Sequence, residues 1–267
     1  MNVTSKYSRS PDSADPVGTK PELSVKTFPT TVEDLDIDFD DRRPNLVTRL
    51  LAGCVDVGRT VSMDFYWGLE VGRRIEWLLI IAERASPGGI RLPLECPECG
   101  EKLEWAVDVV ELSRLNRKSG GDSVVTILHG EKTVSFRKPT GNDQHLWCGR
   151  KFESPEEAER QIARTLALDE GVNLSAGLLA RLNEEMEIRD PLVHFVFATS
   201  CVTCGTEGNY EIDLQEIALD YMRRAQHELA NVVHVIASHY NWSEADILAI
   251  PGRRRQRYIR LIREGKN

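Results

Sequence analysis

The chain has 267 residues, of which 41% are hydrophobic and 28% charged, with a formal net charge of -8 at pH 7 and a pI near 5.4. This composition is typical of a soluble globular protein with one large core or two small ones. The acidic balance argues against attraction of the whole molecule to nucleic acid or to an anionic membrane. No segment approaches the roughly 18 consecutive apolar residues that span a bilayer, and the first residues lack the apolar core of a secretory signal. We therefore expect a cytoplasmic protein in a reducing compartment, where six cysteines indicate metal binding before disulfides.

Residues 1–43 are rich in Ser, Pro, Thr and Asp and show no sustained apolar period. Such a segment cannot bury enough surface to offset the entropy lost on ordering, so we expect a disordered acidic tail. Its last part, residues 33–41, places carboxylates between apolar residues. This pattern favours a solvated linker or, alternatively, a short docking strip for a basic partner surface.

Hydrophobic periodicity and capping signals define the elements that follow the tail. Predicted helices cover, in chain order, residues around 46–51, 71–83, 154–167, 175–188 and 215–240, a short helix from 243 to 250, and an arginine-rich helix ending near 264. Predicted strands cover residues 90–95, 103–109, 124–128, 133–137 and 210–214, and residues 116–122 are expected to form a polar loop. A chain of this kind belongs to the α+β class.

Two short cysteine motifs carry the strongest chemical signal. Cys96 and Cys99 are separated by two residues and followed by glycine, and Cys201 and Cys204 repeat the same arrangement. This spacing lets both sulfurs converge from one tight turn, and the glycine permits the positive φ that the turn needs. Four thiolates suit one tetrahedral structural zinc and leave no open position for water or substrate. An iron–sulfur cluster and a redox dithiol are the alternatives.

The two motifs lie far apart in the sequence. Cys99 and Cys201 are 102 positions apart, whereas ordinary zinc ribbons separate their two motifs by roughly 15 to 20 residues. We therefore predict a split four-cysteine zinc ribbon, with an inserted, mostly helical subdomain between its halves and a helical C-terminal segment. The predicted parts are the disordered tail (1–43), the N-terminal helices and first half of the ribbon (44–110), the inserted subdomain (111–197), the second half of the ribbon (198–214) and the helical docking segment (215–267).

No catalytic pattern emerges from the sequence. It contains no phosphate-binding glycine loop, nucleophile elbow, paired histidine ligands or HExxH helix. The stretch 139–143 lacks the lysine of a P-loop, and a helix cap at Thr140 or Asn142 is the simpler interpretation. His145 and Cys148 are close in sequence, but a satisfied histidine is favoured over a catalytic pair. Cys54 and Cys148 are interpreted as small apolar side chains. We expect a protein that is not an enzyme.

The last helix is crowded with arginines interleaved with apolar residues. Its arginines can simply be solvated, can dock on an acidic partner surface through bidentate contacts, or can bind nucleic acid. The acidic balance of the chain argues against nucleic acid. The residues predicted to bind a partner are Trp242, Arg253, Arg254, Arg255, Arg257, Tyr258 and Arg260.

Three stretches together resemble a known family. Residues 234–251 read HVIASHYNWSEADILAIP and precede the arginines and the sequence YIRLI at 258–262; CPECG occupies 96–100 and RKPTGND occupies 137–143. In this order they resemble the T-even-type phage baseplate hub protein family, which also occurs in phage tail-like contractile injection systems. The chain departs from the family pattern at Ile250, where leucine is usual, at Asn241, and in its N-terminal tail.

The resemblance implies a structural or assembly role at the baseplate or hub of a contractile tail, with no catalytic residues to transfer. The implied partners are baseplate, hub, tube or sheath subunits, and the implied location is the cytoplasm or a phage tail-like particle. The expected cofactor is one structural zinc per chain. The alternative is a zinc-ribbon protein that binds nucleic acid or associates with transcription.

Overall fold

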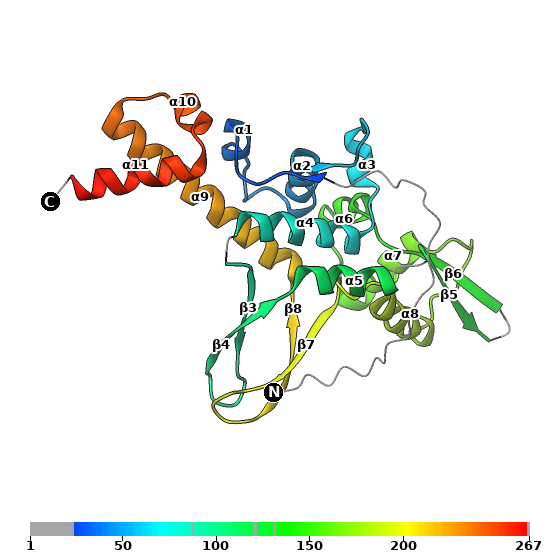
Figure 1. Ribbon diagram of the computed structural model, residues 1–267. Helices are drawn as coiled ribbons and strands as arrows, with labels where there is room; N and C mark the ends of the chain where they lie inside the picture. Colours follow the sequence, from blue (N-terminus) through cyan, green and yellow to red (C-terminus); the bar gives the residue numbers. More distant parts are fainter. Residues whose placement is uncertain (1–23, 87, 120–121, 131, 266–267) are drawn as a thin grey trace, which may run out of the picture.

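The computed structural model describes residues 24–86, 88–119, 122–130 and 132–265 (Figure 1). The predicted α+β class is confirmed, because helices are combined with short antiparallel hairpins. Within the described residues the strands form separate two-stranded pairs rather than one continuous sheet. In the same ranges, no helix combines the length and the apolar character needed to cross a membrane.

Residues 24–43 correct the prediction of a disordered tail, because they are ordered and pack against the rest of the chain. β1 (Ser24–Val25) pairs with β2 (Val55–Asp56), and α1 (Val32–Leu35) forms a single turn. Phe28 and Phe39 are 1% and 9% exposed and pack edge to face, with ring centroids 6.2 Å apart. Two buried aromatic rings thus anchor a segment that has no apolar period of its own.

Hydrogen bonds from distant residues complete this N-terminal segment. The side-chain amide of Gln226 donates to the backbone carbonyls of Asp34, Leu35 and Ile37 at 2.8, 3.2 and 2.9 Å. Because Gln226 lies 189–192 positions further along the chain than these carbonyls, local periodicity cannot reveal the contact. The prediction is therefore wrong for residues 24–43, whereas residues 1–23 lie outside the described residues.

The centre of the molecule is a group of helices packed around α4 (Figure 1). It comprises α2 (Arg43–Cys54), α3 (Met63–Trp67), α4 (Val71–Ala85), α5 (Val109–Ser119) and the first half of α9 (Leu214–Tyr240). α4 follows the predicted helical period, since Leu78, Leu79 and Ala82 are fully buried. It packs along α9 and α5 and therefore joins the two halves of the chain.

α5 corrects the prediction of a strand to residue 109 followed by a polar loop. β4 ends at Val107, and the Asp108 carboxylate then accepts hydrogen bonds from the amides of Val110 and Glu111 at 2.8 and 3.3 Å. Such a side-chain acceptor is typical of a helix start. The buried residues of α5 are Val109, Leu112, Ser113 and Asn116. Their spacing is that of a helix face. The alternation of apolar and polar residues at 103–109 nevertheless favoured a strand in the prediction.

Two hairpins of equal length extend from the central helices (Figure 1), and we call them the cysteine hairpins because each carries one cysteine motif in its turn. The first joins β3 (Ile90–Glu95) to β4 (Lys102–Val107), and the second joins β7 (Phe195–Ser200) to β8 (Glu207–Ile212). β7 was not predicted, and the predicted domain boundary at 197/198 falls inside it.

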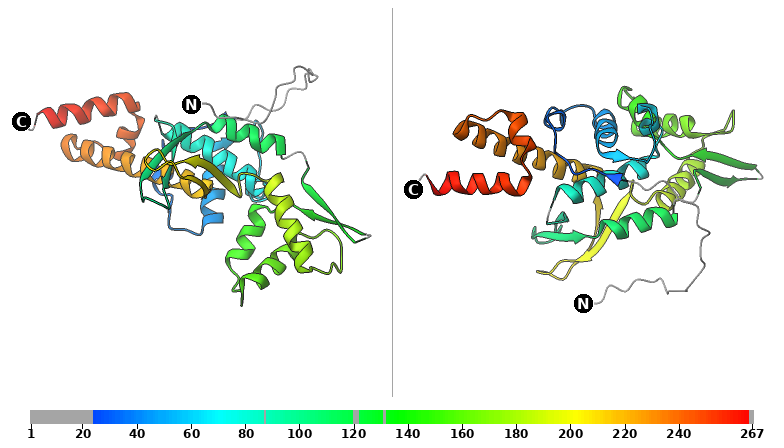
Figure 2. Two further views of the ribbon diagram at one scale, coloured as in Figure 1. Left: turned by 90° about the horizontal axis from the view of Figure 1, so that it is seen from below. Right: turned by 45° about the horizontal axis from the view of Figure 1, so that its top comes forward.

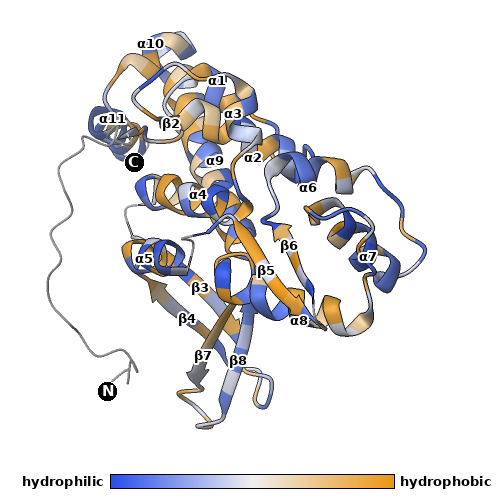
Figure 3. Ribbon diagram, turned by 90° about the vertical axis from the view of Figure 1, so that its right-hand side faces the viewer, coloured by the Kyte–Doolittle hydropathy of each residue, from blue (hydrophilic) through white to orange (hydrophobic). Residues whose placement is uncertain are grey.

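Between the cysteine hairpins, an inserted unit folds around a core of its own. It consists of β5 (Val124–His129), β6 (Lys132–Arg137), α6 (Gly141–Cys148), α7 (Pro155–Leu166) and α8 (Ala176–Arg189). Val125, Phe136 and Leu178 are fully buried in this core. Figure 3 shows the unit on one side of the molecule, beside the cysteine hairpins. Its predicted start at residue 111 falls inside α5, which packs on the central helices instead.

The C-terminal arm (residues 229–264) comprises the second half of α9, α10 (Glu244–Ala249) and α11 (Gly252–Glu264). Its core is separate and consists of Leu229, Val233, Ile236, Ile247, Ile259 and Ile262. Asn241 ends α9 in a left-handed conformation with φ 55°, which turns the chain back. The arm extends away from the central helices (Figure 2), so its outer face is available to a partner.

Candidate metal centre

The two cysteine motifs fold into the same turn. In the first, the amide of Cys96 donates to the carbonyl of Glu101, and the amide of Gly100 donates to the carbonyl of Cys96, both at 2.9 Å. In the second, Cys201 pairs in the same way with Thr206 and Gly205, again at 2.9 Å. The glycines have φ values of 70° and 76°, a conformation that a side chain would strain. The predicted need for glycine at these two positions is thus confirmed.

The turns bring all four predicted ligands together at the ends of the cysteine hairpins. Their Sγ atoms lie within 4.8 Å of one another. Cys96 Sγ lies 3.6 Å from Cys204 Sγ, and Cys99 Sγ lies 3.7 Å from Cys201 Sγ. A tetrahedral zinc with Zn–S bonds of about 2.3 Å requires sulfurs about 3.8 Å apart. The four residues therefore fit one metal ion of this size and geometry.

Hydrogen bonding favours the thiolate form of two of the four cysteines. Cys96 and Cys201 are each 2% exposed, whereas Cys99 and Cys204 face solvent. The Thr206 hydroxyl and then its backbone amide lower the pKa of Cys204 to about 6. The backbone amides of Cys204 and Thr203 lower the pKa of Cys201. Both sulfurs are therefore prepared to act as anionic ligands.

A negative charge on Cys99 is not stabilised by the protein alone. The Glu101 backbone amide lowers the pKa of Cys99, but desolvation and the three neighbouring sulfurs together raise it to about 12. Sulfurs at this distance cannot all ionise unless a cation lies between them. The arrangement is what a divalent metal would complete, because the metal supplies the missing positive charge.

Aromatic side chains add contacts that the sequence did not suggest. Trp105 of the first cysteine hairpin packs against Phe197 of the second, with ring centroids 5.4 Å apart. The backbone amide of Arg91 donates to the Tyr221 hydroxyl at 2.9 Å, which ties the first hairpin to α9. Together with the four sulfurs, these contacts hold two hairpins that share no backbone hydrogen bonds in the described sheets.

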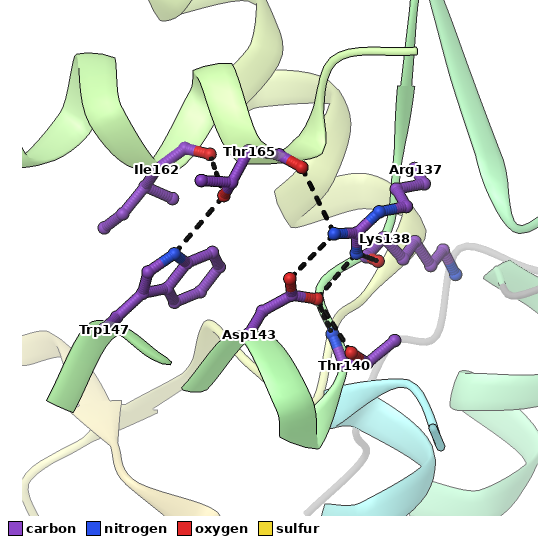
Figure 4. Close-up of polar contacts among 7 residues, drawn as sticks. All are labelled: Arg137, Lys138, Thr140, Asp143, Trp147, Ile162 and Thr165. Atoms are coloured by element: carbon purple, nitrogen blue, oxygen red, sulfur yellow. Dashed lines mark hydrogen bonds and ion pairs between the residues drawn. The ribbon is translucent and has the colours of Figure 1, made fainter. Parts of the chain in front are cut away.

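The stretch 137–143 forms a polar clamp inside the inserted unit (Figure 4). Arg137 binds both carboxylate oxygens of Asp143 at 2.6 and 2.7 Å and donates to the carbonyl of Thr165 at 3.1 Å. Thr140 donates to Asp143 from both its amide and its hydroxyl, and so caps α6 as predicted. Burial raises the pKa of Asp143, but the bonds from Arg137 and Thr140 lower it more.

Gly141 of the same stretch makes room for a buried arginine. A Cβ at Gly141 would lie 2.2 Å from Nη1 of Arg74. Arg74 is fully buried and donates to the carbonyls of Tyr66 and Pro44 at 2.8 and 2.9 Å. Burial lowers its pKa to about 10. The stretch 137–143 therefore joins the inserted unit to the central helices, and its polar groups are already engaged within the protein.

The predicted partner-binding residues are only partly gathered on one face. Trp242 and Tyr258 form an aromatic cluster with Tyr240, with centroid distances of 4.8, 5.3 and 5.7 Å. The exposed arginines beside them are Arg253, Arg254, Arg257 and Arg260. Among the described residues, these four have no carboxylate within 4.0 Å, the limit for an ion pair.

Arg255 differs from the other arginines of α11. It is half-buried and lines a pocket with Phe28 and Leu229, and its Nη1 has no hydrogen-bond partner in the described part of the chain. Burial lowers its pKa. Arg255 therefore lies on the inner side of the arm rather than on the exposed arginine face.

Cys54, His145 and Cys148 lie in different surroundings. Cys54 is buried, and burial raises its pKa to about 12, which makes it an unreactive small side chain. His145 lies with its Nδ1 3.0 Å from the Asn45 side-chain oxygen and packs against Trp67. Cys148 is exposed. The favoured interpretation of a satisfied histidine therefore agrees with these contacts.

Comparisons with protein-family models, with curated proteins and with solved structures find no match to this chain.

Proposed function

We propose that this chain is a structural or assembly component of the baseplate or hub of a contractile, phage tail-like injection system, stabilised by one structural zinc, and that it is not an enzyme. The family in this proposal rests on the resemblance of the three stretches at 96–100, 137–143 and 234–262. The observation that supports it most is that the longest of them, residues 234–262, lies within a separate helical arm with its own core. A projecting module of this kind is suited to docking.

The proposed zinc stabilises the fold rather than performing chemistry. All four ligands come from the protein, so no coordination position is left for water or substrate. In this proposal the two cysteine hairpins and the metal form a split zinc ribbon, with the inserted unit between its halves. A closed site of this type supports a scaffold role.

The proposed docking face of the arm is the exposed arginine row of α11, with the Trp242 and Tyr258 rings beside it. Arginines without carboxylate partners can form bidentate contacts with an acidic subunit surface. Trp242 is exposed and Tyr258 is half-buried, and Trp, Tyr and Arg are the residue types enriched among interface hot spots. The partner we propose is therefore an acidic surface of a baseplate, hub, tube or sheath subunit.

Affinity purification from cells that produce the complete injection system tests the proposal. The tagged chain should recover tail subunits, identified by mass spectrometry, with about one zinc per chain. Charge reversal at Arg257→Glu and Arg260→Glu should abolish recovery without loss of zinc. The matched control reverses two exposed arginines of α7, Arg160→Glu and Arg164→Glu, and should retain the partners. Recovery of nucleic acid or polymerase subunits without tail proteins would contradict the proposal.

A further inference from the structure

A groove of about 510 Å³ lies between α7 and α8 of the inserted unit. Its lining residues recur every three or four positions along α7, from Pro155 to Leu166, and along α8, from Leu179 to Asp190. The large apolar side chains of the lining include Trp147, Ile162, Leu166, Leu179, Leu182 and Met186. The groove is thus elongated along two helices, and its walls are mainly apolar.

The charged groups of the groove are carboxylates. Asp190 lies at the end of α8, is 4% exposed, and has an Oδ2 atom without a hydrogen-bond partner among the described residues. Glu159 and Glu187 also line the groove, whereas no lysine or arginine does. His194, which lies 3.7 Å from Glu187, is the one basic side chain in the lining. The groove therefore presents apolar walls with negative charge beside the C-terminal half of α8.

We propose, independently of the role proposed above, that the α7–α8 groove binds an amphipathic helix of a partner protein, which carries lysine or arginine beside its apolar face. The walls are two helices whose apolar side chains face the space between them, and an amphipathic helix can lay its apolar face into a hydrophobic groove of this kind. A small ligand would fill only part of such an elongated site.

The charges determine the chemistry of this helix. A buried carboxylate oxygen without a donor is unfavourable, and a basic side chain on the incoming helix would satisfy it. Glu159 already accepts from Asn183 at 2.6 Å, so Asp190 and Glu187 are the carboxylates expected to select the cation. An acidic helix would meet like charges beside the C-terminal half of α8, where Glu159, Glu187 and Asp190 lie.

Fluorescence anisotropy on the full-length, zinc-loaded protein tests the proposal with two labelled peptides. One is an amphipathic peptide of leucine and lysine with about four helical turns, and the other has glutamate in place of every lysine. The lysine peptide should bind at least about tenfold more tightly than the glutamate peptide. Ala158→Trp fills the groove and should weaken its binding at least about tenfold, whereas Ala180→Trp, on the exposed side of α8, should not.

A second pair of variants covers the case in which Ala158→Trp does not fold. Glu187→Lys changes the charge of the groove and should weaken binding of the lysine peptide, whereas Glu184→Lys, outside the groove lining, should not. Equal binding of both peptides, absence of binding, or equal binding by groove and control variants would overturn the proposal. Sedimentation showing a dimer that Ala158→Trp dissociates would also overturn it, because a second copy would then occupy the groove.

Discussion

The cysteine hairpins and the β5–β6 hairpin have strands of equal length but are held in different ways. β5 and β6 bury Val125, Ile127, Val134 and Phe136 against α7 and α8. By contrast, only β3 places fully buried side chains in the central core. The apolar side chains of β4, β7 and β8 that pack against this core are half-buried: Leu103, Val107, Phe195, Phe197, Tyr210 and Ile212. An isolated two-stranded hairpin is marginally stable in water. The four cysteines meet at the ends of these less buried hairpins, so we infer that metal binding supplies stability there that apolar burial supplies in the inserted unit.

This difference predicts two kinds of stability within one chain. The cysteine hairpins should depend on the metal and be insensitive to most changes on their exposed faces. The inserted unit should depend on apolar packing and be insensitive to metal removal.

Cys201→Ser should have the largest effect. It removes a buried ligand, and binding of a structural zinc contributes on the order of 10 kcal/mol to the folding of small zinc domains. Zinc content, measured by mass spectrometry of the purified protein, should fall from about one per chain to near zero. The exposed Cys148→Ser is the control and should retain the metal. Retention of zinc by Cys201→Ser would contradict the four-cysteine site.

Phe136→Ala should destabilise the inserted unit by about 3–5 kcal/mol, because it leaves a cavity in a fully buried position. Chemical denaturation followed by circular dichroism measures the change, and zinc content should remain at its original value. Leu128→Ala, at a position that is 59% exposed on the neighbouring strand, should change stability by less than about 0.5 kcal/mol. Loss of zinc from Phe136→Ala would show that the two regions are not independent.

Gly72→Ala should destabilise the contact between α4 and the end of α8. Its Cβ would lie 1.7 Å from Oδ1 of Asp190, so the carboxylate must move, at a cost of about 1–3 kcal/mol. Gly177→Ala, in α8, is the matched control because its Cβ would meet nothing within 4 Å. It should raise stability by up to about 1 kcal/mol through helix propensity. Thermal unfolding of both variants distinguishes the steric effect from the propensity effect.

Asp190→Asn should have the smallest effect, which is a change in how the free energy of unfolding depends on pH. Burial and the charge of Glu70 raise the pKa of Asp190 to about 6, against the opposing effects of Lys138 and the Gly72 amide. Because the folded state holds this proton more tightly than the unfolded state, the contribution is stabilising at low pH and is lost as the pH rises through about 6.

Between about pH 7.5 and about pH 5, the wild-type protein should therefore gain about 1 kcal/mol relative to Asp190→Asn. The difference in unfolding free energy between the two proteins measures this term, and other titrating groups cancel in it. A difference that stays constant with pH would show that Asp190 is ionised to the same extent in the folded and unfolded states.

The metal ligands could be predicted from sequence because each pair is a local pattern. Two cysteines two residues apart and a glycine in a left-handed conformation define the turn without help from the rest of the chain. The sequence also indicated that the two pairs belong together, because neither alone supplies a tetrahedral set. Thr206, Trp105 and Phe197 were missed, since their contacts depend on how the two cysteine hairpins face each other.

The errors in the fold have long-range causes. Side-chain hydrogen bonds from Gln226 and Arg84 hold residues 24–43 in place. No local sequence pattern predicts hydrogen bonds from such distant donors. The α7–α8 groove could not be foreseen either, because it arises from the distance between two helices that were each predicted correctly. α5 is different, because its buried positions and the Asp108 cap are local helix signals. They were outweighed by the alternating pattern of the preceding strand, which led to the prediction of a strand.

Hydrogen exchange measured by mass spectrometry, with and without a zinc chelator, tests the central claim most directly. On removal of the metal, the backbone amides of β4, β7 and β8 should exchange at least about tenfold faster. Those of β5, β6 and α8 should exchange at the original rate, because their core contains no metal ligand. Unchanged protection of the cysteine hairpins, or equal loss of protection in both regions, would contradict the conclusion that stability depends on metal binding in one region only.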